Sequence, residues 1–255
     1  MQEEHLHIIV LDNSTDDYVV ENQIHFSSNL LNYHSMGENV GLSRAYNYAL
    51  SILNNKSEND IVIWFDDDTP IKREYFDCLK DKAEDKTYDV FVPVIYGQNG
   101  VIYSPSKAGW LKGKYIRSPQ QKISQDKFNA INSCLAVRLK AYKGYAYDEG
   151  LFMDCVDTKL FDDFRKKGVQ FCVLPVKICQ NFFQRGSSKD VQKYWNRFQI
   201  RIKDTLYYSQ FAGISKRISG YIRIFGWSMV YGFKLRSIKF SLLCIVEMLK
   251  YRREK

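Results

Sequence analysis

The segment IVIWFDDDTP, residues 61–70, carries the pattern that decides the fold. Its five consecutive apolar residues, Ile61 to Phe65, predict a strand that is buried in a sheet. Three aspartates follow at once, so this strand delivers carboxylates at its carboxyl end. Ligands of open α/β sheets bind outside the carboxyl ends of the strands. The segment therefore predicts an α/β fold with a ligand site beside residues 66–68.

The flanking sequence repeats this alternation of strands and helices. The apolar run HIIVL, residues 7–11, predicts a second buried strand, and the polar residues 12–15 follow it. Apolar residues recur at helical spacing from Leu42 to Leu53 and predict an amphipathic helix. Further strands are expected over 90–95, 131–137 and 169–174, and further helices over 72–82 and 154–167. This order predicts an α/β body whose mostly parallel sheet is flanked by helices.

The last part of the chain has a different composition. Residues 185–255 hold 16 Lys and Arg against 4 Asp and Glu, whereas residues 1–184 hold 21 against 25. The sequence thus predicts a body over 1–184 and a basic, aromatic-rich helical extension over 185–255. Its charge fits solvated helix faces packed on the body, or attachment to an anionic membrane surface. Nucleic-acid binding ranks last, because no recognised motif accompanies the charge.

Composition excludes several classes of protein. No uncharged apolar run approaches the ~20 residues that cross a bilayer, and the amino terminus has no basic, apolar signal pattern. The six cysteines form no C-x-x-C pair, which argues against a zinc knuckle or a disulfide framework. We therefore expect a soluble, cytoplasmic protein with reduced thiols.

Asp66 and Asp68 are the candidate metal ligands. If the strand stays extended beyond Phe65, two residues that are two apart point to the same side. Hard carboxylate oxygens form a partial Mg²⁺ or Mn²⁺ site that substrate phosphates can complete. The alternative is a solvated, aspartate-rich turn. The phosphatase signature D-x-D-x-T is excluded, because Pro70 stands at its threonine position.

Two helix starts carry further candidate residues. Gly41 would let the backbone approach a ligand closely, and Arg44 supplies a guanidinium for phosphate, although an ordinary helix start would look the same. On a helical wheel Asp157 falls within the apolar sector of its helix, with Asp154 one turn before it. Burial raises the pKa of a carboxyl, as a general base requires. A half-exposed helix-start carboxylate is the alternative.

In order along the chain, these pieces resemble the family 2 inverting glycosyltransferases, which have the Rossmann-related GT-A fold. The resemblance is closest to the bacterial rhamnosyltransferase-like branch that builds surface polysaccharides, and it covers about residues 6–182. It rests on IVLDNSTD (9–16), on the N-x-G start of 39–47, on FDDD (65–68), and on DEGLFMDCVDT (148–158) with RKKG (165–168).

The resemblance implies a role for each candidate residue. Asp66 and Asp68 would hold Mg²⁺ or Mn²⁺ on the donor diphosphate. Asp157 would deprotonate the acceptor hydroxyl, with Asp154 as its neighbour or stand-in. The nucleotide sugar would be bound by Asp12, Asn13, Ser14, Asn39, Gly41, Arg44, Asn47 and Asp67.

The implied function is transfer of a sugar, rhamnose among the candidates, from a nucleotide sugar to a glycan or lipid-linked saccharide, with inversion. The protein would be peripheral on the inner face of the cell membrane and would not bind nucleic acid. The alternative is a catalytically impaired, truncated relative that acts as a membrane-attached scaffold in a polysaccharide assembly complex.

Three departures from the family pattern stand out. The family begins with an additional strand and helix, including a Tyr-Asn pair, and this sequence starts too late to contain them. Lys159 and Asp163 replace a Glu and an Arg, and the swapped pair preserves an i,i+4 attraction. The histidine that relatives carry after the 169–174 strand is Gln180 or Asn181 here, which bears on a third metal or diphosphate ligand.

Overall fold

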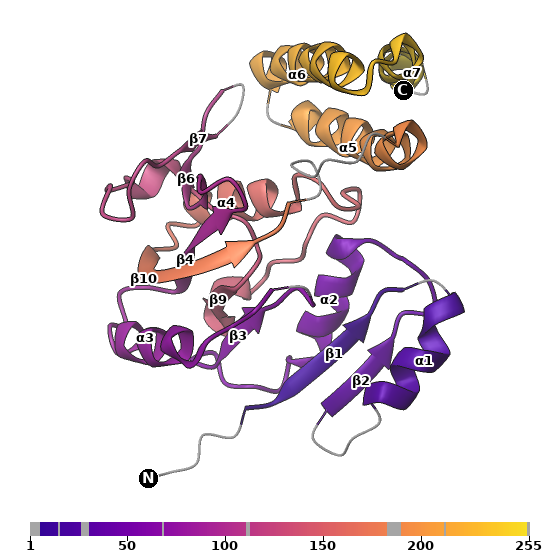
Figure 1. Cartoon of the computed structure of the whole chain (residues 1–255). Coiled ribbons are helices and arrows are strands. Elements are labelled where there is room, and N and C mark those ends of the chain that lie inside the picture. The colour runs from indigo at the N-terminus through magenta and orange to yellow at the C-terminus, as the bar shows by residue number, and fades with distance from the viewer. Residues whose placement is uncertain are drawn as a thin grey trace.

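The structure is a computed structural model that describes residues 6–14, 16–26, 31–67, 69–110, 113–182, 190–211 and 213–253. An α/β body occupies most of the chain, and three long helices stack at the end of the molecule far from the amino terminus (Figure 1).

Four strands form the central sheet in the order β10–β4–β9–β3. They are β3 (Ile61–Trp64), β4 (Val90–Gly97), β9 (Leu135–Arg138) and β10 (Phe171–Gln180), and the short β5 (Ile102–Ser104) pairs with β4. The strands β1 (Ile8–Asp12) and β2 (Leu31–Ser35) form a second, two-stranded parallel sheet. The predicted α/β class is confirmed, and both acidic segments follow the carboxyl ends of strands, β1 and β3.

The expectation of a mostly parallel sheet is wrong. Of the seven strand pairings in the described residues, only β1–β2 and β10–β4 are parallel. The physical reason is β9, which lies between β3 and β4 and runs antiparallel to both. A parallel neighbour needs a crossover connection, usually a helix, whereas β9 enters from the irregular segment around residues 97–130.

That irregular segment holds strands too short to give a periodic pattern in sequence. The strands β6 (Ser106–Lys107), β7 (Lys114–Tyr115) and β8 (Phe128–Asn129) form a small antiparallel sheet. One 3₁₀ turn, Gln125–Lys127, leads into β8. A second 3₁₀ turn, Leu139–Tyr142, follows β9.

The helices of the body lie close to their predicted positions. They are α1 (Asp16–Phe26), α2 (Leu42–Ile52), α3 (Arg73–Ala83) and α4 (Val156–Lys166). Of these four helices, α1 has no counterpart among the predictions, and neither has the strand β2 that follows it. In α4 Lys159 and Asp163 form the expected i,i+4 ion pair.

Two apolar cores cover opposite faces of the central sheet. On one face Val90 and Val92 of β4 pack with residues of α4 such as Leu160 and Phe164. On the other, Phe91 and Ile95 pack with Tyr75 of α3. Alternate residues of a strand point to opposite faces, so the continuous apolar run of β4 serves both cores, as a strand buried on both sides requires.

Beyond residue 190 the chain is helical, as predicted. The helices α5 (Val191–Phe211), α6 (Gly213–Leu235) and α7 (Ile238–Arg253) share a core of their own. The α5 helix lies against the body, while α6 and α7 lie beyond it (Figure 1). The expected boundary between residues 184 and 185 falls outside the described residues. Among the described helices, none combines the length and the apolar character needed to span a bilayer.

Arg138, at the end of β9, is a charged residue of the interior with only 1% of its surface exposed. Its guanidinium donates to the backbone carbonyls of Tyr88 (3.0 Å), Asn59 (3.4 Å) and Ala83. It thereby ties the sheet to the loops that precede β3 and β4.

We predict that Arg138→Met lowers the free energy of unfolding by about 3 kcal/mol, because three partly buried carbonyls lose a charged, buried donor. Urea denaturation measures this, and Arg73→Met, at a side chain that is 92% exposed, serves as the control with an effect below about 0.5 kcal/mol. Equal effects of the two substitutions would contradict the assignment.

Candidate functional site

The segment before α4, residues 148–155, is held in place by α5. The buried carboxylate of Asp204, only 3% exposed, accepts hydrogen bonds from the backbone N–H groups of Phe152 (3.0 Å), Met153 (2.7 Å) and Asp154 (2.7 Å). Tyr207, also on α5, lies so close to Gly150 that a Cβ there would meet its ring at 2.0 Å. The carboxyl end of this segment is therefore fixed by the C-terminal helices rather than by the sheet.

Asp157 stands in the first turn of α4, where this segment enters the helix. Burial raises the pKa of its carboxyl to about 6, partly opposed by the hydrogen bond from the Thr158 backbone N–H (2.6 Å) and reinforced by the charge of Asp154. The prediction from the helical wheel placed it on the apolar face, and the structure places it half-buried. A carboxyl with such a pKa is ionised at neutral pH and can accept a proton.

Asp154, three residues earlier, has a different environment. Its carboxylate is paired with the guanidinium of Arg197 and lies 3.8 Å from that of Arg201, both on α5. Arg201 in turn stacks on Trp227 at 4.2 Å. The two guanidinium groups occupy the oxygens of Asp154, so it is poorly placed to contact a substrate hydroxyl.

Tyr46 of α2 links Asp157 to the end of β3. Burial raises the pKa of the Tyr46 hydroxyl, and the charges of Asp66 and Asp157 both raise it further. Charge effects of this kind weaken with distance and are strongest inside the protein. The two carboxylates, 91 residues apart in sequence, therefore both lie within electrostatic range of the Tyr46 hydroxyl.

Asp66 lies in a turn rather than in an extended strand. The strand β3 ends at Trp64, and the backbone N–H of Thr69 donates to the carbonyl of Asp66 (3.3 Å). The same-side argument for Asp66 and Asp68 required an extended backbone, so it does not apply here. Asp68 lies outside the described residues, and Asp67 is exposed in the turn.

Two side chains, one beside Asp66 and one beside Tyr46, have a buried oxygen without a partner. Gln180, the last residue of β10, donates its amide N–H to Asp66 (2.9 Å), and its own carbonyl oxygen Oε1 has no partner. The Oδ1 atom of Asn132 is also buried and unpartnered, and the Asn132 side chain lies beside the Tyr46 hydroxyl. Unpaired buried oxygens are costly, and amide and carboxylate oxygens are the ligands that Mg²⁺ and Mn²⁺ prefer.

The described residues contain no group of three or more His, Cys, Asp or Glu side chains that could hold a metal. A cation at Asp66 would therefore draw on the amide oxygens of Gln180 and Asn132 and on substrate phosphates. Oxygen ligands of this kind suit a hard divalent cation.

Asp12, the last residue of β1, is fully engaged within the protein. It accepts hydrogen bonds from the Ser14 backbone N–H (2.9 Å), the Asn22 amide (3.0 Å) and the Tyr33 hydroxyl (2.5 Å). Burial by itself would raise the pKa of Asp12, but these hydrogen bonds outweigh it and lower the pKa to about 2. Asp12 organises the turn after β1, and Asn13 and Ser14 belong to the same turn.

The N-x-G segment closes onto that turn. Asn13 accepts a hydrogen bond from the Val40 backbone N–H (2.8 Å) and donates to Asn39 (3.3 Å). Gly41 has a positive φ of 85°, and a Cβ there would meet Phe152 at 2.7 Å. The sequence suggested that Gly41 lets the backbone approach a ligand closely. In the structure the group that approaches Gly41 is Phe152 of the segment before α4.

Two other predicted residues on α2 reach the same segment. Asn47 is bonded to both the backbone N–H (2.7 Å) and the carbonyl (3.0 Å) of Tyr147. Arg44 lies 3.5 Å from Glu149, and both side chains are more than half exposed. The structure therefore joins Gly41 and Asn47 to the segment before α4 and Asn39 to the turn after β1. Of the predicted residues on α2, the Arg44 side chain is exposed.

Sequence reasoning missed four residues of this region: Tyr46, Asn132, Gln180 as a partner of Asp66, and Asp204. A signal existed for Gln180, because either Gln180 or Asn181 stands where the resemblance places a histidine. Nothing in the local pattern marks Asp204, whose three partners lie about 50 residues away.

An α/β body with carboxylates at a strand end and at a helix start, followed by a helical region, is the arrangement of GT-A-like glycosyltransferases. The chain belongs to glycosyl transferase family 2, since the model of the family "Glycosyl transferase family 2" matches residues 2–145. No curated protein matches the sequence.

Two solved structures are similar to this chain, and the first shares its fold. One is GalNAc-T7 with UDP, GalNAc and Mn²⁺, which is 14% identical with a TM-score of 0.53 and is matched over 93% of this chain. The other is TarS 1–349 of S. aureus, also 14% identical, with a TM-score of 0.46 over 100% of this chain and 85% of that chain. The chain spans about half the length of the GalNAc-T7 structure, 50% of it being covered.

We predict that Asp12→Asn lowers the free energy of unfolding by about 2 kcal/mol at pH 7. A carboxyl whose pKa is lowered on folding stabilises the protein above its unfolded pKa, ordinarily near 4, and this contribution is lost as the pH falls toward about 2. The difference between wild type and variant should therefore shrink between pH 5 and pH 3 in urea denaturation. A difference that stays constant over this range would contradict it.

Proposed function

We propose that this chain is an inverting glycosyltransferase in which Asp157 is the catalytic base. One arrangement supports the proposal: Asp157, half-buried at the start of α4 with a raised pKa, and Asp66, just beyond the end of β3, both lie within electrostatic range of Tyr46 on α2. One group suits the acceptor hydroxyl and the other suits the donor diphosphate, and a transfer reaction requires both in one place.

In this reaction the acceptor oxygen attacks the anomeric carbon of the donor. Asp157 takes the hydroxyl proton as the new C–O bond forms, and the bond from the anomeric carbon to the diphosphate oxygen breaks with its electron pair leaving on the nucleoside diphosphate. A positioned carboxylate contributes roughly 10²- to 10⁴-fold to such a step. Attack from the side opposite to the leaving group inverts the anomeric centre.

On the donor side Asp66 and Asp68 are the proposed ligands of Mg²⁺ or Mn²⁺, with Gln180 and Asn132 supplying amide oxygens. Such a cation, when bound, neutralises the charge that develops on the departing diphosphate. Mn²⁺ and UDP accompany GalNAc-T7 in the solved structure of that protein. The orphaned oxygens of Gln180 and Asn132 support a cation of this kind here.

The remaining donor contacts are proposed at the turn of Asp12, Asn13 and Ser14, and at the exposed side chains of Asp67 and Arg44. Asn39, Gly41 and Asn47 would act through the backbone that they hold. Asp154, which Arg197 and Arg201 neutralise, is proposed as a positioning residue rather than a second base.

The acceptor is proposed to be a glycan or lipid-linked saccharide of surface polysaccharide synthesis, on the cytoplasmic face of the membrane. The branch resemblance makes rhamnose one of the donor sugars to test. We also propose the division into a transferase domain, 1–184, and a helical extension, 185–255. The alternative of a catalytically impaired scaffold predicts no binding of any nucleotide sugar.

We predict that Asp157→Asn reduces kcat by roughly 10²-fold or more while donor affinity changes little. In the wild type, kcat/KM should fall as the pH drops through about 6, because protonated Asp157 cannot accept a proton. Transfer assays over a panel of nucleotide sugars and pH values measure both. Asp77→Asn, at an exposed residue of α3, is the matched control, and unchanged turnover in Asp157→Asn would refute the assignment.

We predict that Asp66→Ala and Gln180→Ala each weaken metal-dependent binding of the nucleoside diphosphate by about tenfold or more, because each removes an oxygen ligand. Isothermal titration calorimetry with Mn²⁺ present and absent measures this without any turnover. Asp77→Ala should bind like the wild type. If the wild type binds no nucleotide sugar at all, the scaffold reading stands and the transferase proposal is withdrawn.

A further inference from the structure

The two outermost helices expose a continuous set of large apolar side chains. On α6 their spacing is four, four, three, four and four residues, which places them on one side of a helix. All are exposed, Phe233 to 88% and Ile214 to 77%. They are Ile214, Ile218, Ile222, Phe225, Met229 and Phe233. Together they cover about 28 Å of helix length at 1.5 Å per residue.

The α7 helix adds a second set beside the first. Ile238, Leu242, Val246 and Leu249 follow the same spacing and are all exposed. The two helices pack closely, since the Ser241 hydroxyl donates to the Ser228 carbonyl (2.8 Å) and a Cβ on Gly232 would meet it at 1.9 Å. We call these ten exposed side chains of α6 and α7 the apolar face.

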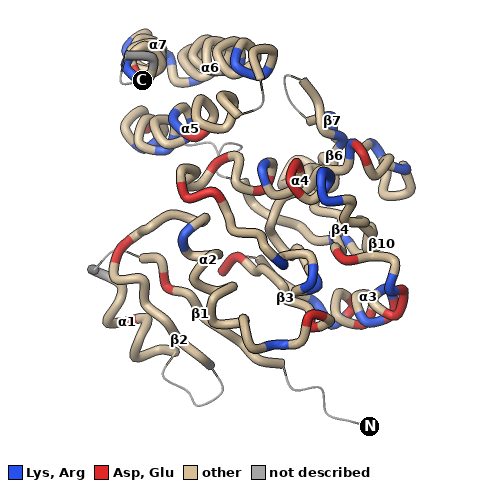
Figure 2. The backbone as a smooth tube through the Cα atoms, turned by 180° about the vertical axis from the view of Figure 1, so that it is seen from behind, with Lys and Arg blue, Asp and Glu red and all other residues tan. Residues whose placement is uncertain are grey.

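Charge at this end of the molecule has one sign. Residues 213–253 contain nine Lys and Arg and one acidic residue, Glu247. Glu247 is buried and lies 3.5 Å from Lys203, so it leaves no negative charge on the surface. Arg217, Lys239 and Lys250 are exposed beside the apolar face. In Figure 2, Lys and Arg recur along α5, α6 and α7 with few acidic residues between them.

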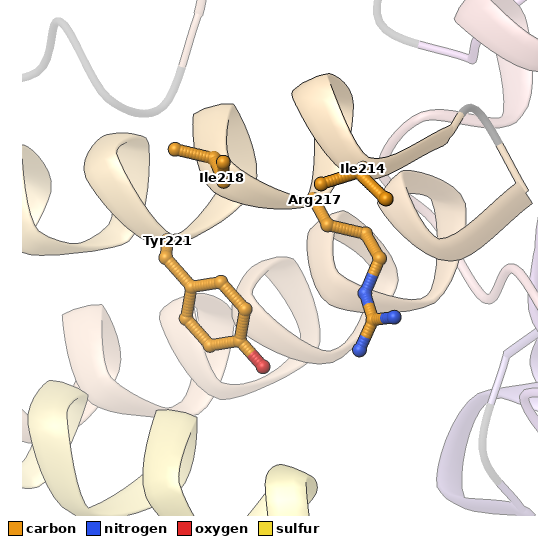
Figure 3. A pocket seen from close by; sticks show the side chains of 4 residues that line it. All are labelled: Ile214, Arg217, Ile218 and Tyr221. Carbon is orange, nitrogen blue, oxygen red and sulfur yellow. The ribbon is translucent and has the colours of Figure 1, made fainter.

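A small cavity lies at one end of the apolar face. It measures about 310 Å³ and is lined by Ile214, Arg217, Ile218 and Tyr221. The side chains of Arg217 and Tyr221 extend from the helix in the same direction (Figure 3). An apolar pair beside a guanidinium suits an acyl chain next to a phosphate group.

We propose that the apolar face inserts into the headgroup region of a membrane leaflet that carries anionic lipids. Helices with an apolar side and basic margins lie in the plane of this interface, and each basic residue near anionic headgroups adds to the attraction. None of the described helices could cross the bilayer, so the attachment is parallel to the surface. A second copy of the chain fits less well, because pairing two such faces would bring their basic margins together.

One consequence of this docking, the distance of Asp157 from the membrane, rests on the proposed function. The α5 helix lies between the apolar face and the segment that it holds through Asp204 and Arg197. Docking of α6 and α7 would therefore set the distance of Asp157 from the leaflet. An acceptor anchored in that leaflet would meet the base at a fixed height, which favours a lipid-linked acceptor over a free glycan.

The test uses the full chain and vesicles of two compositions: phosphatidylcholine alone, and equal parts of phosphatidylcholine and phosphatidylglycerol. The variant Phe225→Glu with Met229→Glu places two charges in the apolar face. Tyr18→Glu with Val20→Glu is the matched control, because these α1 side chains are also exposed. Circular dichroism verifies that all variants are folded, and nucleotide binding is measured on the same samples.

We expect the wild type and the control to sediment with the mixed vesicles, and the α6 variant to lose about tenfold or more of its partitioning. Lys239→Glu with Lys250→Glu should weaken binding to mixed vesicles only. Equal sedimentation of the α6 variant and the wild type would overturn the proposal. The proposal would also be overturned if the wild type did not sediment with vesicles but formed a dimer that the α6 variant disrupts, as measured by light scattering. Nucleotide binding reports separately on the proposed function.

Discussion

The position of the candidate base depends on one buried carboxylate. Asp204 accepts three backbone N–H groups from residues 152–154, and without it those donors would be unsatisfied inside the protein. Burial raises the pKa of Asp204, while the three hydrogen bonds favour its ionised form. Because Asp204 belongs to α5, the segment that leads into α4 takes its shape from the C-terminal helices. The helical region is thus part of the site and not an appendage to it.

The same arrangement explains why two neighbouring aspartates differ. The Asp154 carboxylate pairs with the arginines of α5, whereas burial and the charge of Asp154 raise the pKa of Asp157. The turn between them passes through Cys155, whose φ of 65° is costly for a residue with a side chain. That left-handed residue allows the backbone to change direction before the helix begins. This change of direction at Cys155 lets Asp154 pair with the arginines of α5 while Asp157 stays able to accept a proton.

Local sequence patterns predicted most of the fold and part of the site. Three patterns correspond to elements of the structure: the apolar runs at 61–65 and 90–95 to β3 and β4, and the spacing of Leu42 to Leu53 to α2. Apolar runs and periods are local signals of burial, so they can be recognised in the sequence alone. The antiparallel β9 and the two-residue strands β6 to β8 were not predictable, since pairing direction is set by partners distant in sequence. For the same reason Asp157 was found from its helical wheel, whereas Tyr46, Asn132 and Asp204 emerged only from tertiary contacts.

The side chain at position 180 affects how the charge of this site depends on pH. A histidine in its place would titrate near neutral pH, in the same range as Asp157. An amide does not titrate, yet it offers one oxygen to a cation and one N–H to Asp66. Burial raises the pKa of Asp157 to about 6, so its protonation changes between pH 5 and pH 8. Since the side chain of Gln180 adds no titration of its own, the pH dependence of the proposed reaction should follow Asp157.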